Sequence, residues 1–207
     1  MNKNQTFIFV TFATIYSAST LFGTYPFNWL LKLIPIAILI VVTFKQLETR
    51  ADKIFLVGLL CSAAGDFFLT YEPSDWFIYG LGSFLVAHLF YIISLLPLEL
   101  KKLPFAVAYI AFGIITFSII APGLGSLFAP VFAYMTVLLL MAIFTLFSRK
   151  SNKWLITGGI CFAISDSLLG INKFSTSVPL ASLLIMASYY LAQFSLVKGI
   201  VNQRSGQ

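Results

Sequence analysis

Charged side chains are scarce in this chain. Lysine, arginine, aspartate and glutamate make up 10% of its 207 residues, while 59% of the residues are hydrophobic. Soluble globular domains carry about 25% charged residues, so the composition excludes an ordinary soluble protein. Polar stretches long enough to form a second globular unit are also lacking. We therefore expect a single integral membrane domain over residues 1–207.

Side chains that bind metal ions or act as nucleophiles are few as well. The chain has one histidine, His88, and two cysteines, Cys61 and Cys161, which both lie inside apolar runs. Zinc hydrolases need several histidine or cysteine ligands, so the sequence excludes that type of metal hydrolysis. The cysteines are expected to be small buried residues without a disulfide. Ser165 and Ser167 lack the histidine that would complete a catalytic triad.

Long apolar runs, in contrast, fill most of the chain. A membrane-spanning helix needs about 20 apolar residues, and eight runs are candidates for this role. Short breaks rich in proline, glycine or charge separate them, so neighbouring helices should pack antiparallel. The first run is too long for a signal peptide and lacks a cleavage site behind it. We predict an all-α polytopic protein with spans at 5–23, 27–45, 54–70, 76–97, 103–121, 126–147, 154–171 and 178–198.

The net charge of +6 comes from basic residues in the short loops between these runs. There they determine topology and contact anionic lipid, so we do not expect nucleic-acid binding. One side holds Lys173, with Lys32 just inside the second span. The other side holds Lys3, Lys45, Arg50, Lys53, Lys101, Lys102, Arg149, Lys150, Lys153, Lys198 and Arg204. The positive-inside rule then predicts that both termini are cytoplasmic, and the short loops favour a bacterial inner membrane.

Two aspartates, Asp66 and Asp166, lie inside apolar runs at matching positions. The third and seventh spans share a glycine, a cysteine, this aspartate and a leucine at a constant offset of 100 residues. The offset covers four spans, an even number, so the halves 1–100 and 101–207 should be parallel repeats related by a two-fold axis along the membrane normal. Such an axis would let the two acids face one another near the outer ends of their helices. An acid inside the membrane costs about 2.5–3.5 kcal/mol and is a functional-site hypothesis by default.

Two carboxyl groups close together in a medium of low dielectric constant cannot both ionise cheaply. One would stay protonated and the other ionised, which places an acid and a base in one pocket. This pair suits hydrolysis through an oxocarbenium-like cation, as in two-carboxylate glycosidases. Two alternatives use the same acids. A transporter or lipid flippase would bind protons or a cationic substrate with them, and a scaffold protein would use them to hold its halves together.

Other polar residues inside the spans are further candidates. Lys32 could pair with an acid, hold a lipid phosphate or extend to the membrane surface. Ser62 lies one helical turn before Asp66 on the same face. His88, in the fourth span, is either a packing residue or a catalytic one. Tyr134, Tyr190 and Gln193 could hydrogen-bond a headgroup or the acids, Ser165 flanks Asp166, and Asn172 could cap the seventh helix or line a pocket mouth.

These motifs, in this order, resemble the YhhN family of membrane proteins, whose animal members are the lysoplasmalogenases. The matching segments are Lys32-Leu-Ile-Pro35, Ser62-Ala-Ala-Gly65-Asp66, Gly80-Leu-Gly-Ser-Phe84, Ala87-His88-Leu-Phe-Tyr91, Tyr134-Met135, Ser165-Asp166-Ser167-Leu168, Asn172-Lys173-Phe174 and Tyr189-Tyr190-Leu-Ala-Gln193. They extend over nearly the whole chain. In one departure, two residues separate the lysine from the proline, where the family pattern has them adjacent.

The resemblance implies hydrolysis of the vinyl-ether bond of a lysoplasmalogen, which yields a fatty aldehyde and glycerophosphoethanolamine or glycerophosphocholine. One of the catalytic residues Asp66 and Asp166 would protonate the alkene carbon, and the other would stabilise the cation and activate water. The implied partners are a lysophospholipid substrate and membrane lipid, and no cofactor is required. The expected substrate-binding residues are Lys32, Ser62, His88, Tyr91, Tyr134, Ser165, Asn172, Tyr190 and Gln193.

Overall fold

The computed structural model describes residues 1–72, 74–99 and 103–201, and within them the chain forms eight α-helices and no β-strand. The helices are α1 (Lys3–Ser19), α2 (Asn28–Phe44), α3 (Arg50–Tyr71), α4 (Phe77–Ser94), α5 (Leu103–Ile120), α6 (Phe128–Phe147), α7 (Lys153–Phe174) and α8 (Ala181–Val201). Each predicted apolar run corresponds to one helix, which confirms the predicted all-α class.

Polar caps explain why two helices begin earlier than their apolar runs. The Thr49 hydroxyl accepts a hydrogen bond from the Asp52 amide, and the Asp52 carboxylate accepts one from the Thr49 amide, so α3 begins with a capping box at Arg50. The Asn152 side chain accepts hydrogen bonds from the amides of Trp154 and Leu155 at the start of α7. These caps satisfy amide groups that have no partner inside the helix.

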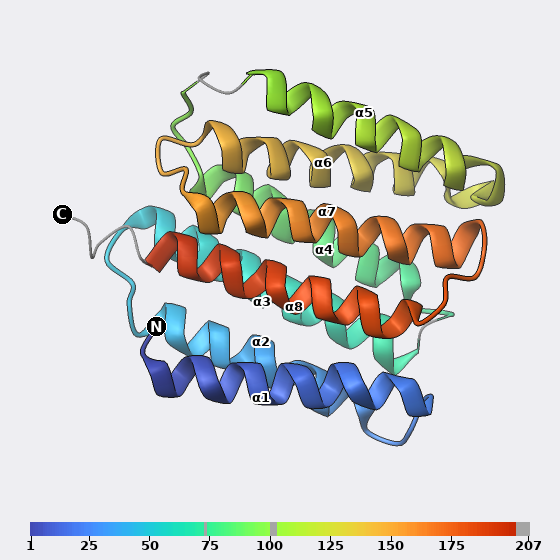
Figure 1. The fold of residues 1–207 in the computed structure, drawn as a ribbon, viewed down its shortest axis with the longest axis horizontal. Helices are drawn as coiled ribbons and strands as arrows, with labels where there is room; N and C mark the ends of the chain where they lie inside the picture. Colours follow the sequence, from blue (N-terminus) through green and yellow to red (C-terminus); the bar gives the residue numbers. More distant parts are fainter. Residues whose placement is uncertain (73, 100–102, 202–207) are drawn as a thin grey trace.

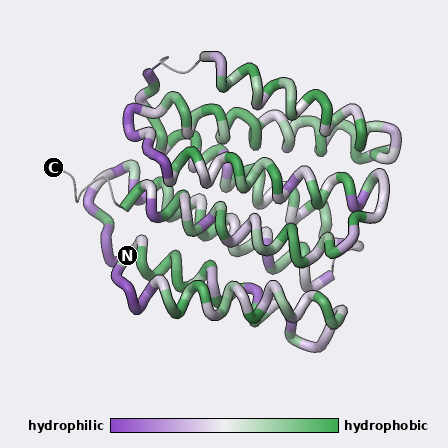
Figure 2. The backbone as a smooth tube through the Cα atoms, in the orientation of Figure 1, coloured by the Kyte–Doolittle hydropathy of each residue, from purple (hydrophilic) through white to green (hydrophobic). Residues whose placement is uncertain are grey.

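The helices have the length and composition of membrane spans. Seven helical segments are long and apolar enough to cross a membrane, and α2, with 17 residues, is a shorter apolar helix. Figure 2 shows mostly hydrophobic helix bodies and hydrophilic segments gathered towards the end where the N-terminus lies. The chain is therefore an all-α polytopic membrane protein. Of the basic residues predicted for the cytoplasmic side, Lys101, Lys102 and Arg204 lie outside the described residues.

The helices lie side by side, and the N-terminus and the last turn of α8 lie at the same end of the bundle (Figure 1). We call this the terminal end, and we call the opposite end, with the α1–α2, α3–α4, α5–α6 and α7–α8 connections, the pocket end. The most extensive helix contacts are α3 with α4 and α7 with α8. Further contacts join α4 to α6 and α2 to α8, so residues far apart in the sequence meet between these helices. The parallel repeat of halves 1–100 and 101–207 stays a prediction.

Small residues at matching positions allow the two main helix pairs to approach closely. A Cβ atom at Gly58 of α3 would lie 2.5 Å from the Tyr91 ring of α4. The equivalent atom at Gly158 of α7 would lie 2.7 Å from the Leu196 side chain of α8. Membrane helices commonly pack through small residues in this way, because the backbones can then approach without a side chain between them.

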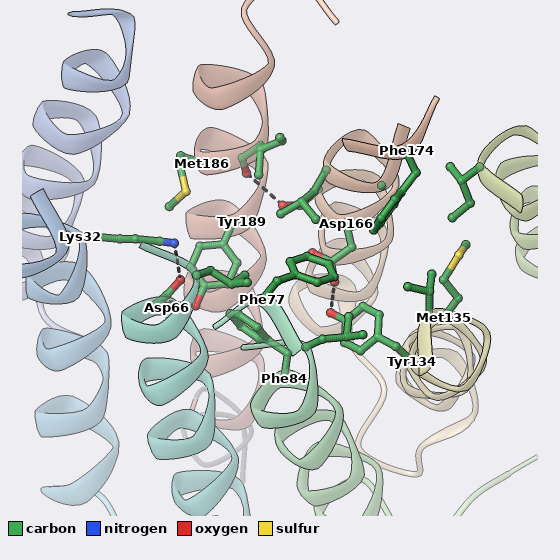
Figure 3. Close-up of a pocket in the computed structure, with 18 residues that line it drawn as sticks. Lys32, Asp66, Phe77, Phe84, Tyr134, Met135, Asp166, Phe174, Met186 and Tyr189 are labelled. Carbon is green, nitrogen blue, oxygen red and sulfur yellow. Dashed lines mark hydrogen bonds and ion pairs between the residues drawn. The ribbon is translucent and has the colours of Figure 1, made fainter. Parts of the chain in front are cut away.

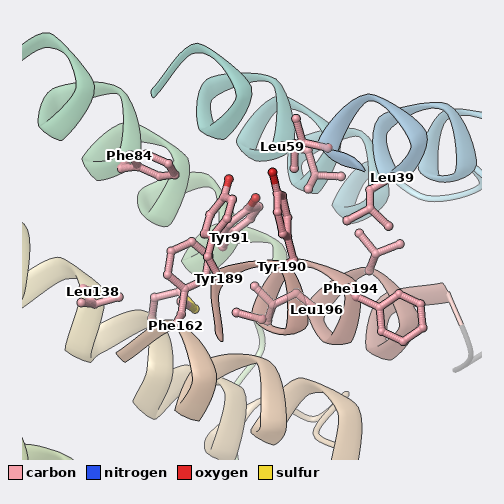
Figure 4. Packing of buried hydrophobic residues seen from close by; sticks show 14 of the residues in the cluster. Leu39, Leu59, Phe84, Tyr91, Leu138, Phe162, Tyr189, Tyr190, Phe194 and Leu196 are labelled. Atoms are coloured by element: carbon pink, nitrogen blue, oxygen red, sulfur yellow. The ribbon is translucent and has the colours of Figure 1, made fainter. Parts of the chain in front are cut away.

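Aromatic side chains fill the space between these helix pairs (Figure 4). The ring of Tyr189 makes edge-to-face contacts with Phe84 and Phe162, at centroid distances of 5.8 and 5.6 Å. Tyr190 lies beside it and packs at 6.3 Å against Phe9 of α1. Edge-to-face pairs are a favoured aromatic geometry, and here they fix the direction in which the Tyr189 hydroxyl points.

Candidate functional site

A small cavity of about 70 Å³ lies among the central helices, and both intramembrane aspartates line it (Figure 3). Six of its eighteen lining residues have polar side chains: Lys32, Asp66, Tyr134, Ser165, Asp166 and Tyr189. The other lining residues are apolar or glycine and come from α3 to α8. A cavity of this volume holds a few water molecules, because one water needs roughly 10–15 Å³ on the same measure. It can therefore enclose the reacting part of a ligand together with water.

Asp66 is buried and has two partners that bear hydrogen. The Lys32 ammonium nitrogen lies 3.2 Å from its Oδ1 atom, and the Tyr189 hydroxyl donates a hydrogen bond of 2.6 Å to its Oδ2 atom. Lys32 is itself only 7% exposed and also donates to the Thr70 hydroxyl at 2.9 Å. Buried charges are tolerated where they are paired and hydrogen-bonded. Both contacts stabilise the carboxylate form of Asp66.

Asp166 has different surroundings. Its side chain is partly exposed to the cavity, and its Oδ2 atom accepts a hydrogen bond from the Tyr134 hydroxyl. No ion pair involves Asp166 within the part of the chain that the structure describes. The neighbouring Ser165 donates its hydroxyl to the Ile185 carbonyl at 3.0 Å and so holds α7 against α8. The two acids thus share one cavity, and among the described residues only Asp66 has a cation as partner.

A chain of hydrogen bonds runs from Asp66 away from the cavity. The Gln193 amide donates to the Tyr189 hydroxyl at 3.2 Å, so the Tyr189 hydrogen is directed to Asp66. The Tyr91 hydroxyl donates to the Gln193 carbonyl oxygen at 3.0 Å. The Ser62 hydroxyl lies 3.1 Å from the Tyr91 oxygen and is left to donate to it. Each link therefore points its hydrogen towards Asp66, and such chains polarise one another in a medium of low dielectric constant.

Three of the predicted substrate-binding residues, Tyr190, Asn172 and His88, do not line the cavity and contact other parts of the protein instead. The Tyr190 hydroxyl donates to the Lys32 carbonyl at 2.9 Å, which ties α8 to α2 next to the ion pair. The Asn172 side chain accepts from the Val178 amide at 3.0 Å in the α7–α8 connection. His88 is fully buried between the rings of Phe162 and Tyr134, and neither of its nitrogens makes a hydrogen bond to a described residue.

The structure brings five of the eleven predicted site residues to the cavity, namely Lys32, Asp66, Tyr134, Ser165 and Asp166. Ser62, Tyr91 and Gln193 lie behind it, in the hydrogen-bond chain that ends on Asp66. His88, Asn172 and Tyr190 are not among the lining residues.

The sequence reasoning missed Tyr189, which contacts Asp66 directly. The sequence spacing indicates this residue, because Tyr189 is four residues from the predicted site residue Gln193 and shares a helical face with it.

Within the described residues, no group of three or more histidine, cysteine, aspartate or glutamate side chains gathers in a way that could hold a metal ion. The cavity is instead formed by two carboxyl groups, one ammonium group and two phenols, in a mainly apolar wall. This set can donate and accept protons and can stabilise a positive charge that develops between the two acids.

The chain matches the YhhN family over residues 27–200, which include both aspartates and Lys32. A lysoplasmalogenase of Mycobacterium tuberculosis is 35% identical over 159 residues, which cover 72% of this chain and 61% of that protein. Human lysoplasmalogenase TMEM86A is 30% identical over 172 residues, covering 78% and 70% of the two chains, and mouse TMEM86B is 33% identical over 171 residues, covering 81% and 73%.

The chain thus spans about three fifths of the mycobacterial relative, at 61% of its length. No solved structure matches it. The match covers most of the chain and includes every residue that lines the cavity. The protein belongs to the YhhN family.

Proposed function

We propose that this protein is a lysoplasmalogenase, which hydrolyses the vinyl-ether bond of a lysoplasmalogen with Asp66 and Asp166 as its catalytic residues. The observation that carries the proposal is the shared cavity, in which two carboxyl groups with different partners line one mainly apolar space. The relatives named lysoplasmalogenase, at 30–35% identity, support the same reaction.

The partners of the two acids suggest their roles. Asp66 is the carboxylate, because Lys32 and Tyr189 both stabilise its negative charge. Asp166 is the proton donor, because it has no cationic partner among the described residues and is partly exposed to the cavity. The Tyr134 hydroxyl occupies its Oδ2 atom, which leaves Oδ1 to carry the acidic proton. The mainly apolar wall limits competing water, and such exclusion strengthens electrostatic interactions inside a site.

The reaction then proceeds in three balanced steps. Asp166 transfers its proton to the alkene carbon remote from the ether oxygen, which leaves an oxocarbenium ion facing the Asp66 carboxylate. Water adds to the cationic carbon and gives one proton to Asp66, which forms a hemiacetal. The hemiacetal C–O bond to glycerol then breaks, with Asp66 returning its proton to the departing oxygen and Asp166 taking the hydroxyl proton. The products are an aldehyde and a glycerol hydroxyl, and both acids regain their starting states.

The proposal is tested by measuring aldehyde release from a lysoplasmalogen with purified protein in detergent. The informative variants are Asp66→Asn and Asp166→Asn, which keep the side-chain shape but remove the ionisable group. Asp75→Asn, an exposed acid near the pocket end, is the matched control. We expect activity in the wild type and the control, and a loss of about 10²–10⁴-fold in each site variant. A folded wild-type protein that is inactive on every vinyl-ether lysolipid would overturn the proposed enzymatic function.

The same preparation distinguishes the alternative of a transporter or flippase. An enzyme turns its substrate over in detergent, where no gradient exists, whereas a transporter needs sealed vesicles to show its activity. Acid-dependent movement of lysolipid across vesicles, together with no hydrolysis in detergent, would establish the transporter.

For the membrane orientation, we propose that both termini face the cytoplasm of a bacterial inner membrane. The support is the positive-inside pattern of the described loops, with Lys45, Arg149 and Lys150 at the terminal end and Lys173 at the other. An impermeant thiol reagent on intact cells should label Thr176→Cys and leave Lys3→Cys unlabelled until the cells are opened. The reverse labelling pattern would contradict this orientation.

A further inference from the structure

We propose that Lys173 binds the phosphate group of the lysolipid substrate at the mouth of the acid cavity. This inference rests on the proposed function and adds a headgroup-binding residue to it. Lys173 is exposed and lies in the last turn of α7, at the pocket end of the bundle.

The ammonium group of Lys173 is held against the cavity wall. It lies 4.4 Å from the centroid of the Phe77 ring and 5.9 Å from that of Phe174, and both of these rings line the cavity. Phe77 belongs to α4 and Phe174 to α7, so the cation bridges two helices at the rim. Attraction between a cation and an aromatic face fixes its position without using its charge in an ion pair.

The charge of Lys173 is available to a ligand. Within the described residues it forms no ion pair, whereas Lys32, the other cation near the cavity, is buried and already bound to Asp66 and Thr70. The four connections at the pocket end, residues 20–27, 72–76, 121–127 and 175–180, contain no lysine or arginine. The charged residues of these connections are the acids Glu72 and Asp75. A phosphate at the mouth therefore has Lys173 as its cationic partner.

The spacing along α7 fits the substrate. Asp166 and Lys173 are seven residues apart, which places them on one face of the helix and two turns, about 10 Å, apart along its axis. In a lysoplasmalogen, a chain of about seven bonds of roughly carbon–carbon length joins the alkene carbon that is protonated to phosphorus, and this chain spans a comparable distance. A lysine acts as a point charge for phosphate, so it tolerates the freedom of a glycerol linker.

The test measures binding separately from catalysis. Its probes are a saturated 1-alkyl lysophospholipid, which has the phosphate but no alkene, and the matching 1-alkylglycerol, which lacks the phosphate. Affinity for each is measured by titration calorimetry in detergent for the wild type, Lys173→Ala, Lys173→Arg and Lys53→Ala, an exposed helix lysine at the terminal end. We expect Lys173→Ala to weaken binding of the lysophospholipid by about tenfold and to leave the alkylglycerol unchanged, with Lys173→Arg and Lys53→Ala close to wild type.

Equal affinity of Lys173→Ala and wild type for the lysophospholipid, or an equal loss for both probes, would overturn the role of Lys173. Because neither probe can be hydrolysed at an alkene, this result does not depend on turnover. Aldehyde release, measured in parallel on a lysoplasmalogen, reports whether the proposed hydrolysis is correct. The two failures are thus seen in different assays.

Discussion

Asp66 and Asp166 occupy matching positions in the sequence, yet their surroundings differ. Asp66 is buried beside Lys32 and receives the end of a hydrogen-bond chain. Asp166 has a single tyrosine and an open side towards the cavity. At the offset of 100 residues that relates the two acids, the residue matching Lys32 is Phe132, which is 54% exposed. One changed neighbour thus gives two acids at matching positions different electrostatic surroundings, and under the proposed function this difference assigns them different chemical roles.

The largest expected effect comes from neutralising both acids. Under the proposed function the two acids act as one unit, so the double variant Asp66→Asn/Asp166→Asn should have the same kcat as the slower single variant. We expect this kcat to be lower than that of the wild type by about 10³-fold or more. Aldehyde release in detergent measures it. If the losses of the two single variants multiply in the double variant, the acids act independently, which would contradict their complementary roles in one reaction.

Lys32→Met should have the next largest effect, and mainly on stability. It leaves Asp66 buried without its cation, a change that costs about 3–5 kcal/mol when one partner of a buried pair is removed. Adding Asp66→Asn should restore much of the unfolding free energy but not the activity. Unfolding in detergent, monitored by tryptophan fluorescence, checks both variants. A stable and fully active Lys32→Met protein would show that the ion pair does not distinguish the two acids.

The two tyrosines that contact the acids should differ in their cost to stability. Tyr189→Phe removes a donor from Asp66 and also leaves the Gln193 amide without its acceptor, whereas Tyr134→Phe affects Asp166 alone. A buried polar group left unpaired costs about 1–3 kcal/mol, so Tyr189→Phe should be the less stable variant. Both should lower kcat. Equal unfolding midpoints for the two variants would contradict the difference in surroundings.

The smallest effect is expected behind the cavity. Tyr91→Phe removes the donor to Gln193, which lies three hydrogen bonds away from Asp66 along the chain. It should lower kcat by about three- to tenfold with KM unchanged, the effect of one weakened hydrogen bond. Ser188→Ala is the control, because its half-buried hydroxyl donates to the Leu184 and Ile185 carbonyls of its own helix. A change in KM instead of kcat for Tyr91→Phe would indicate a substrate contact and not a positioning role.

Much of the fold followed from local features of the chain. Eight apolar runs became eight helices, because a run of that length can bury its backbone polar groups in lipid only as a helix. Because Thr49 caps the helix, α3 begins a few residues before the start of its apolar run, a detail that the apolar pattern alone does not contain. The two aspartates stood out for the same reason, since a charge inside an apolar run is costly wherever the helix packs.

The hydrogen-bond partners of those acids could not be predicted from local sequence features. Tyr189 and Tyr190 are adjacent, and both are tyrosines in the same predicted segment, but only Tyr189 reaches Asp66 while Tyr190 reaches the Lys32 carbonyl. Successive residues of a helix point about 100° apart, so the rotation of α8 against α2 and α3 decides which hydroxyl meets the acid.

The sequence by itself determined the number of helices, the membrane class and the two acids, because these depend on the length of apolar runs and on the cost of charge in lipid. Only the tertiary structure decided that Lys32 pairs with Asp66 and not with Asp166, and that Gln193 aligns a hydrogen-bond chain towards the same acid. Asp66 lies 34 positions from Lys32 and 123 positions from Tyr189 in the chain, and helix packing alone brings these residues together.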